Sequence, residues 1–564
     1  MASINSTHIQ RHAVENLILI CLDKNIKEYE NSLYLFQLYV NTIKLYSNPE
    51  EFRTFIQQIK DENLLVIISG NVVEQVTSEM ENHSQIDSVY IYCNQKEYHE
   101  NCATNSPKIK GVYSNLQSIH DALRRDVRRI NNDSISIQIL SNRKSNELEQ
   151  SFTCALLLKE ILINSESNEQ IKQEFIKFSR FYYEKNSNEL NLIDLFEKNN
   201  YNQITPIEWY TRECFISSMI HRALRLYDIE ILYKLAFFIR DLHKQINDSY
   251  LQSTDHQKLT VYYGLGISND QFTKLNMNIN DLISFNTFLF TTIDRKSSLN
   301  FAKQSENDLH LIPVLFQIEI DRSKSSSSPF IALDDLDYYH DSDRHVLFTL
   351  NSIFRIVHIE RGEDEIQQIN LILIDDDNED RLKNLKHSIQ KQLNGFFSLG
   401  QMMMETNDLI KAKSIFEILL KNATASNQKE LVSIHRKLGL IDQRMKDWTG
   451  ALLHYKQCLN MQLSFLPPND RFLGPSYAGV GAILMKLCNY DEALEYYQHA
   501  IDCGRNTSHV DSSLIATYYI GTGQILHIQG KNSEARKNFE LALTFAQKSH
   551  TLLPEIKHYL TIIS

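Results

Sequence analysis

Five aspartates gather in residues 332–343, which read ALDDLDYYHDSD and stand directly before an apolar run that starts at Val346. They are Asp334, Asp335, Asp337, Asp341 and Asp343. Carboxylates at the edge of a cleft can stabilise a cation that develops during bond cleavage. Charged residues between two strands are also typical of a solvated turn. Which of these two roles applies depends on the strands on either side of the segment.

The elements that would position these aspartates are short strands between Leu259 and Glu360. Four runs read LTVYYGLGIS, LISFNTFLFTT, HLIPVLFQIEI and VLFTLNSIFRIVHIE. They are rich in Val, Ile, Phe, Tyr and Thr and are broken by Gly, Asn, Asp and Ser, which is the pattern of strands joined by turns. A sheet over residues 255–375 is predicted.

Three short motifs in this sheet resemble those of the NAD-dependent mono-ADP-ribosyltransferases that modify arginine. That family carries an arginine in a YRG strand, a strand beginning SFxxFxSTS, and an ExE pair before a strand reading VLF…FRI. In this chain the corresponding positions hold Tyr262-Tyr263-Gly264, Phe290-Thr291-Thr292 and Asp343-Arg344-His345. The apolar frame is kept around Ser284-Phe285 and Phe354-Arg355-Ile356. The resemblance implies an ADP-ribosyltransferase fold with altered chemistry.

The resemblance also implies roles for single residues. In the family the strand arginine binds phosphate, the serine orders the site, the second glutamate stabilises the oxocarbenium-like ribose, and the first engages the acceptor guanidinium. These roles fall to Tyr263, Phe290, His345 and Asp343 respectively. Gly264, Ser284, Thr291 and Thr292 are the other expected contacts of NAD, which would be the substrate. No metal is expected.

The altered side chains predict weak or absent arginine transfer. Tyr263 cannot form a bidentate cationic clamp on phosphate. Phe290 lacks a hydroxyl, and His345 cannot supply a negative charge. Loss of one group that stabilises the transition state typically costs ~10²–10³ in rate.

Two alternatives would preserve some activity. The site could use a shifted frame in which Asp335, Asp337 or Asp341 supplies the charge. A sister clade of the family uses a histidine and tyrosines to seat nicotinamide, but its histidine lies on the first strand, whereas His345 precedes Val346.

Composition limits the remaining functions. The chain has 564 residues, a formal net charge of −12 and eight scattered cysteines without a C-x-x-C pair. An acidic balance disfavours a nucleic-acid surface, and the cysteine spacing does not suit zinc. No leader peptide and no apolar run of ~20 residues is apparent, so a cytoplasmic protein without membrane contact is expected.

Residues 1–140 alternate between apolar runs and helical patterns. The runs are LILICL at 17–22, LLVII at 64–68, VYIYC at 89–93 and GVY at 111–113. Helices are predicted over Tyr29–Leu45 and Ile119–Val127. Continuous apolar strands between helices indicate a small doubly wound parallel sheet. Asp23 and Ser69-Gly70-Asn71 follow two strands, but they do not supply the carboxylate cluster of a phospho-acceptor domain.

Residues 141–380 begin with a helical prelude at 145–250. Apolar spacing predicts helices over Leu148–Ile163, Ile171–Tyr183, Pro206–Leu226 and Ile229–Ile246. The expected core residues are Trp209, Phe215, Met219, Ile220, Leu224, Phe237 and Phe238. His221 and His243 lie on these helices and are expected to be surface or satisfied interior residues rather than ligands.

Residues 385–564 repeat. Gly400, Gly439, Gly481 and Gly523 stand at equivalent points of successive units, as do Ala412, Ala451, Ala493 and Ala535. A small residue is needed where two antiparallel helices cross closely. The pattern resembles tetratricopeptide repeats, which form an α-solenoid with a concave face for a protein or peptide ligand.

The chain is thus expected to combine α/β, α+β and all-α domains. By resemblance it is an NAD-dependent arginine mono-ADP-ribosyltransferase with weak or no activity. The alternative is a non-catalytic scaffold in which the transferase fold and the repeats bind other molecules without turnover.

Overall fold

A computed structural model of the chain divides into two compact units, residues 1–393 and 394–564. The structure describes the following residues: 17–25, 36–37, 40, 42–59, 63–73, 75–76, 83–93, 108–133, 137–141, 146–165, 169–184, 186–199, 204–212, 214–253, 258–276, 279–303, 305, 311–322, 328–333, 344–362, 366–374, 379–392, 395–423, 427–505, 512–546 and 552–563.

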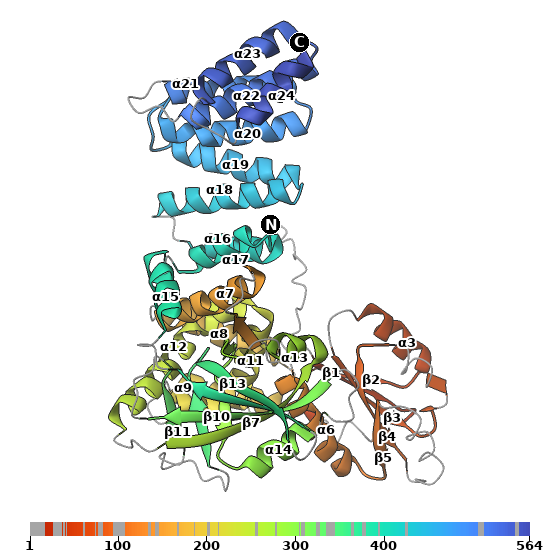
Figure 1. Cartoon of the computed structure of the whole chain (residues 1–564). Helices are drawn as coiled ribbons and strands as arrows, with labels where there is room; N and C mark the ends of the chain where they lie inside the picture. The colour runs from red at the N-terminus through yellow and green to blue at the C-terminus, as the bar shows by residue number, and fades with distance from the viewer. Residues whose placement is uncertain are drawn as a thin grey trace. The chain divides into compact units, whose positions relative to one another are not determined.

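The first sheet is five-stranded and fully parallel, in the order β2-β1-β3-β4-β5 (Figure 1). Its strands are β1 (Leu17–Leu22), β2 (Thr42–Tyr46), β3 (Asn63–Ser69), β4 (Ile86–Tyr92) and β5 (Ile109–Tyr113). The predicted parallel α/β sheet is confirmed.

Both faces of this sheet are covered, which explains why its strands are continuously apolar. Ile18, Ile20 and Leu22 of β1 pack with Phe52 of helix α3 (Pro49–Gln58). The alternate residues Leu17, Leu19 and Cys21 pack on the other face, with residues of helix α6 (Leu116–Asp133). The alternation of side chains along a strand therefore gives one strand two cores.

One prediction for this sheet is wrong. The helix expected over Tyr29–Leu45 does not reach its end, because Thr42–Tyr46 form strand β2. Thr, Ile and Tyr favour the extended conformation, and β2 pairs with the edge of β1 through the register Ile18↔Thr42 to Leu22↔Tyr46. Pairing with a neighbour outweighed the helical spacing of the sequence.

After α6 and β6, the described residues form a helical layer: α7 (Asn146–Ile163), α8 (Glu169–Tyr182), α9 (Ser187–Asn199), α10 (Pro206–Thr211), α11 (Phe215–Leu226) and α12 (Ile229–Gln252). All the core residues predicted here are at most 4% exposed. Phe196 of α9 packs edge-on against Trp209 and Phe215, at ring distances of 5.2 and 6.0 Å. Interlocked rings of this kind fix the angles between short helices.

The single helix expected over Pro206–Leu226 is two helices. The chain leaves helical geometry at Arg212, the C-cap of α10, and Cys214 is the N-cap of α11. Ser217 supports this break because its hydroxyl donates to the Arg212 carbonyl oxygen at 2.9 Å. The apolar period continues through the break, which is why the pattern suggested one helix.

The second sheet is mixed and nine-stranded, in the order β11-β12-β9-β7-β10-β14-β13-β8-β6. Its strands are β6 (Ile137–Leu140), β7 (Lys258–Ser268), β8 (Leu282–Phe285), β9 (Phe290–Thr292), β10 (Leu311–Asp321), β11 (Phe330–Ala332), β12 (His345–Phe348), β13 (Ile353–Arg361) and β14 (Gln367–Leu373). Residues 137–140, at the end of the range expected for the first domain, thus belong to this sheet through β8.

Helices α13 (Asn269–Asn276) and α14 (Arg295–Lys303) contact β7. A Cβ atom at Gly264 of β7 would lie 1.9 Å from the carbonyl oxygen of Ser298. Only glycine permits this approach of α14 to the strand. After the sheet, α15 (Asp380–Gln392) contacts α7, and Arg381 forms an ion pair with Glu149 at 3.1 Å.

The second unit consists of helical hairpins and one final helix (Figure 1). The hairpins are α16 (Gly395–Glu405) with α17 (Leu409–Asn422), α18 (Gln428–Arg444) with α19 (Trp448–Leu463), α20 (Gly474–Lys486) with α21 (Tyr490–Arg505), and α22 (Ser512–Ile528) with α23 (Asn532–Phe545); α24 (Leu553–Ile563) follows. The predicted repeats are confirmed.

In each hairpin, a buried alanine and an aromatic ring lie where the two helices pack together. The four repeat alanines are fully buried, and four residues after each alanine stands an aromatic ring: Phe416, Tyr455, Tyr497 or Phe539. A Cβ atom at Gly400, Gly439, Gly481 or Gly523 would lie 2.9–3.1 Å from the ring of its own hairpin. The glycine therefore makes room for the ring, and the ring fills the space between the two helices.

Candidate functional site

The three strands that carry the transferase-like motifs are neighbours in the nine-stranded sheet. β9 lies between β12 and β7, with Thr292 opposite both His345 and Tyr262. Residues far apart in the sequence are therefore brought to one part of the sheet. The side chains on these strands decide what this part can do.

Tyr263 belongs to the interior of the sheet. It is 8% exposed and contacts Phe285 edge-on, with ring centroids 5.9 Å apart. Phe285 packs in turn on Phe316 and Phe354. Tyr263, which the sequence resemblance aligned with a phosphate-binding arginine, is thus one ring of an apolar core.

Phe290 and His345 lie face to face. Their ring centroids are 4.6 Å apart with an angle of 30° between the planes, and both side chains are half-buried. A packed aromatic pair excludes water but offers no negative charge. These are the two positions at which the sequence resemblance predicted the serine and the second glutamate of the transferase family.

The hydroxyls of Thr291 and Thr292 hold the adjacent strand. Thr291 Oγ1 donates to the Val346 carbonyl oxygen at 2.9 Å, and Thr292 Oγ1 donates to the Arg344 carbonyl oxygen at 3.2 Å. Thr292 Oγ1 also accepts the backbone N–H of Asp294 at 3.0 Å. Both side chains therefore form hydrogen bonds that link β9 to neighbouring backbone.

The remaining predicted site residues lie in different surroundings. Ser284 is fully buried on β8, between β13 and β6, and its hydroxyl has no hydrogen-bond partner among the described residues. Gly264 faces α14, so it points to the side of the sheet opposite Tyr263. Asp343 and the other four aspartates of the acidic segment lie outside the described residues.

Two histidines tie the helical layer to this region. His221 lies 3.3 Å from both the Tyr210 and the Thr287 hydroxyl oxygens, and His243 Nδ1 lies 2.7 Å from Thr349 Oγ1. Burial lowers the pKa of each imidazole to about 4. Both are neutral, satisfied interior residues, as the sequence predicted.

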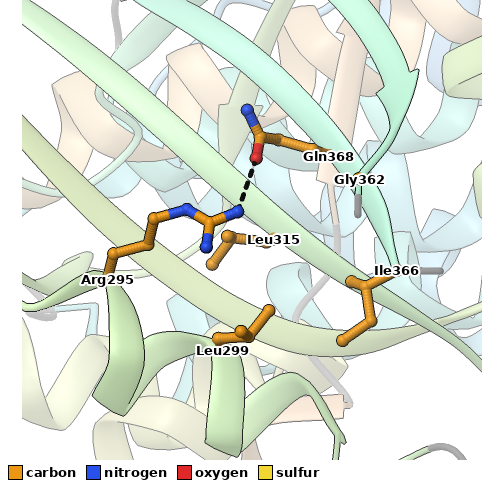
Figure 2. Close-up of a pocket in the computed structure, with 6 residues that line it drawn as sticks. All are labelled: Arg295, Leu299, Leu315, Gly362, Ile366 and Gln368. Atoms are coloured by element: carbon orange, nitrogen blue, oxygen red, sulfur yellow. Dashed lines mark hydrogen bonds between the residues drawn. The ribbon is translucent and has the colours of Figure 1, made fainter. Parts of the chain in front are cut away.

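A small pocket opens on the α14 side of the sheet (Figure 2). Leu299, Leu315 and Ile366 line it together with Gly362, and the Arg295 guanidinium donates to Gln368 Oε1 at 3.2 Å across one side. None of the predicted site residues lines this pocket. Neither the pocket nor the three motif strands therefore show a preformed dinucleotide site within the described residues.

The second unit offers a different kind of surface. The first helices of the hairpins, α16, α18, α20 and α22, are expected to line the concave face of the repeats and are here called the inner layer; among them, α20 contacts α22. On this layer Arg436 and Leu440 of α18 are exposed, as is Thr517 of α22. Gln524 of α22 is held by Glu555 and Tyr559 of α24 at 3.1 and 3.2 Å. The inner layer thus exposes both polar and apolar side chains.

The part of the chain that the structure describes has neither a metal cluster nor a membrane-spanning helix. There, no three side chains among His, Cys, Asp and Glu gather closely enough to hold a metal ion. Within the same residues, no helix combines the length and apolarity required to cross a bilayer.

Known proteins resemble this chain in its repeats. The tetratricopeptide repeat model matches residues 475–548. Protein HGV2 of Halocynthia roretzi is 30% identical over 104 residues, which are 18% of this chain and 20% of that protein. The nuclear autoantigenic sperm protein of Homo sapiens is 26% identical over 108 residues, or 19% of this chain and 13% of that protein. The chain therefore matches a fifth or less of the length of these relatives.

Among solved structures, the similarities are low in identity and in TM-score. BtubC from P. vanneervenii is 16% identical, with 32% of this chain and 74% of that chain covered and a TM-score of 0.28. The TPR2B domain of yeast Sti1, solved in a complex named for pHsp70, is 18% identical, with coverages of 24% and 96% and a TM-score of 0.20. The family model alone identifies the region near the C-terminus as tetratricopeptide repeats, a module that mediates protein binding.

Proposed function

We propose that this chain is a protein-binding scaffold. Its tetratricopeptide repeats hold a peptide segment of a partner protein in the groove formed by the first helices of the hairpins. Its nine-stranded sheet is an ADP-ribosyltransferase-like fold in which arginine transfer is weak or absent. The repeats would thus bind a partner protein, and the nine-stranded sheet would keep a transferase-like fold without the side chains that catalyse transfer.

The observation that carries the loss of transferase chemistry is the packed pair Phe290–His345, whose rings are tilted by 30°. Cleavage of the nicotinamide–ribose bond needs negative charge beside the developing cation. An aromatic ring packed on an imidazole provides none, and protonation of His345 would oppose the cation. Tyr263 is likewise committed to the apolar core rather than to phosphate.

The groove supports the other half of the proposal. Leu440 is 39% exposed beside Arg436 on α18, although a buried position would stabilise a leucine. An exposed leucine next to an arginine suits a peptide that has both an apolar and an acidic side chain.

A displayed peptide library selected on the full chain tests this binding. Selected peptides are expected to lose about tenfold in affinity, ~1.4 kcal/mol, when Leu440→Glu is introduced. Leu453→Glu is the matched control, because Leu453 is 56% exposed on α19, a second helix outside the inner layer. If both variants reduce peptide affinity equally, or if neither variant reduces it, the peptide does not bind at Leu440 of α18.

Residual transferase activity is the second candidate function. It is favoured by one observation, the adjacency of β7, β9 and β12. The combined changes Tyr263→Arg, Phe290→Ser, Asp343→Glu and His345→Glu restore the family's residues at four of the altered positions and leave Thr292 in place of the last serine. NAD-dependent labelling of an arginine-rich acceptor by this variant would support the transferase-like fold, whereas a folded but inactive variant would count against it.

A further inference from the structure

One ion pair of the second unit lies in its core. Asp442 of α18 is fully buried, and its Oδ1 is 2.7 Å from Nζ of Lys413 on α17. At the same position, three residues after the repeat glycine, the other hairpins carry Met403, Leu484 and Leu526, all of them buried. A carboxylate therefore occupies a place that apolar packing fills elsewhere in the unit.

Two histidines extend this ion pair across the hairpin. His454 of α19 has its Nε2 3.8 Å from Asp442 Oδ2, and its Nδ1 lies 3.1 Å from Nδ1 of His435 on α18. Residues at the position of His435, four before the repeat glycine, are Phe396, Tyr477 and Tyr519 in the other hairpins. Lys413, Asp442, His454 and His435 thus form a polar chain, here called the buried network, in one hairpin.

The short distance between the two imidazoles fixes their protons. A neutral imidazole has one N–H and one acceptor nitrogen, so two Nδ1 atoms at 3.1 Å can share a single proton. Because Asp442 faces Nε2 of His454, the tautomer with Nε2–H is favoured on His454, and His435 then donates through Nδ1. A second proton at this contact would leave two N–H groups facing each other.

The surroundings oppose such a proton. Burial lowers the pKa of His435 and of His454, and each is further affected by charge. The groups that act on the network are Lys413 and Glu417 of α17, Asp442 of α18, Asp447 at the start of α19, and the two imidazoles on each other. The neighbouring helix α20 adds no interaction that shifts either imidazole pKa.

Space for the network is limited. A Cβ atom at Gly450 of α19 would lie 2.8 Å from Asp442 Oδ2, so the helix passes directly over the carboxylate. Asp442 and the imidazoles consequently cannot separate unless α18 and α19 move apart. A change in proton number must appear as a change in the packing of this hairpin.

We propose that the buried network makes the α18–α19 hairpin a pH-sensitive joint in the repeat unit. The joint is closed when both imidazoles are neutral and share one proton through their Nδ1 atoms. Uptake of a proton by His454 at Nδ1, the acceptor atom, breaks that hydrogen bond and opens the hairpin. Hairpin α20–α21 carries Tyr477 and Leu484 in place of His435 and Asp442 and has no such joint.

Hydrogen exchange of the full chain tests the proposal, because it reports the opening of each helix separately. After correction for intrinsic rates, α18 and α19 should open more readily at about pH 5.5 than at about pH 7.5. The limit is about tenfold per pH unit for each proton taken up. Peptides of α20 and α21 serve as the internal control and should not change.

Two variants keep the proposal open to contradiction. His435→Phe combined with His454→Ile installs the residues of hairpin α16–α17 and should abolish the pH difference. His454→Gln keeps a polar side chain without a titratable proton, and it should reduce the difference at least about threefold even if the double variant does not fold. An unchanged difference in either folded variant, or no difference in the wild type, would overturn the proposal.

Discussion

Replacing Gly264 with alanine tests how the motif strand β7 is held against α14. The new Cβ would lie 1.9 Å from the Ser298 carbonyl oxygen and 3.1 Å from the Ala302 backbone nitrogen. Real contacts of this kind are not closer than 3.0 Å, so α14 must shift by about 1 Å. Because the opposing atoms belong to the backbone, no rotamer change relieves the overlap. We expect a loss of about 3–5 kcal/mol in the free energy of unfolding of the first unit.

The measurement can be confined to that unit. The chain has two tryptophans, and Trp209 is fully buried in the first unit. In a Trp448→Phe background, urea unfolding followed by fluorescence therefore reports Trp209 alone. Gly362→Ala is the matched control, because its Cβ would meet only the Ile366 carbonyl oxygen, at 3.4 Å. We expect this control to change stability by no more than about 0.5 kcal/mol. Equal effects of the two substitutions would refute the role of Gly264 as a packing glycine.

Two further substitutions test buried side chains, Glu189 in the first unit and Tyr497 in the second. Glu189 accepts the Phe215 backbone N–H at 2.9 Å, and burial raises its pKa from 4.5 to about 7. A raised carboxyl pKa means that the fold favours the protonated form, so stability should be lost as pH rises from about 4.5 to 7. Glu189→Gln should therefore gain up to roughly 2–3 kcal/mol over the wild type at pH 8, measured by Trp209 fluorescence, and an equal gain at about pH 4.5 would contradict this cause. In the repeats, Tyr497→Ala should cost about 3–5 kcal/mol and speed the hydrogen exchange of α20–α22, because the ring is 5% exposed and fills the space beside Gly481 and Gly521. Tyr496→Ala, at a half-buried neighbour, should have a clearly smaller effect.

The repeats were predictable because their signal is local. Gly439 and Ala451 lie within a single hairpin, and the contact between its two helices requires small residues at these positions. The parallel sheet was predictable for a similar reason. The continuous apolar run of β1 has no explanation other than burial on both faces.

Elements that depend on distant partners were not predictable. The apolar residues before and within β2 are spaced as in a helix, so the sequence predicted a helix there. Only the pairing of β2 with β1 shows that it is an edge strand. Tyr262 and Tyr263 are adjacent tyrosines of β7, and the sequence does not show which of them faces the core. The fold shows that Tyr263 joins the apolar core. The hydroxyls of Thr291 and Thr292 likewise gain their roles from the backbone of residues more than 50 positions away.

The buried network shows a further limit. Asp442, His435 and His454 resemble ordinary polar residues of amphipathic helices when the sequence is read alone. Alignment of the hairpins on their glycines reveals that Asp442 and His435 replace apolar or aromatic residues, which is a signal that sequence comparison within the chain could have found. The distances between the side chains still required the fold.

Intact mass measurement after incubation with NAD is the sharpest test of whether this chain transfers ADP-ribose. The purified full chain is mixed with NAD and an arginine-rich acceptor, with a transferase that has an intact YRG, STS and ExE set as the positive control. The account predicts no gain of one ADP-ribose unit on the acceptor, because Tyr263, Phe290 and His345 provide neither a phosphate clamp nor the required negative charge. Robust labelling that is lost on Asp343→Ala would contradict the account.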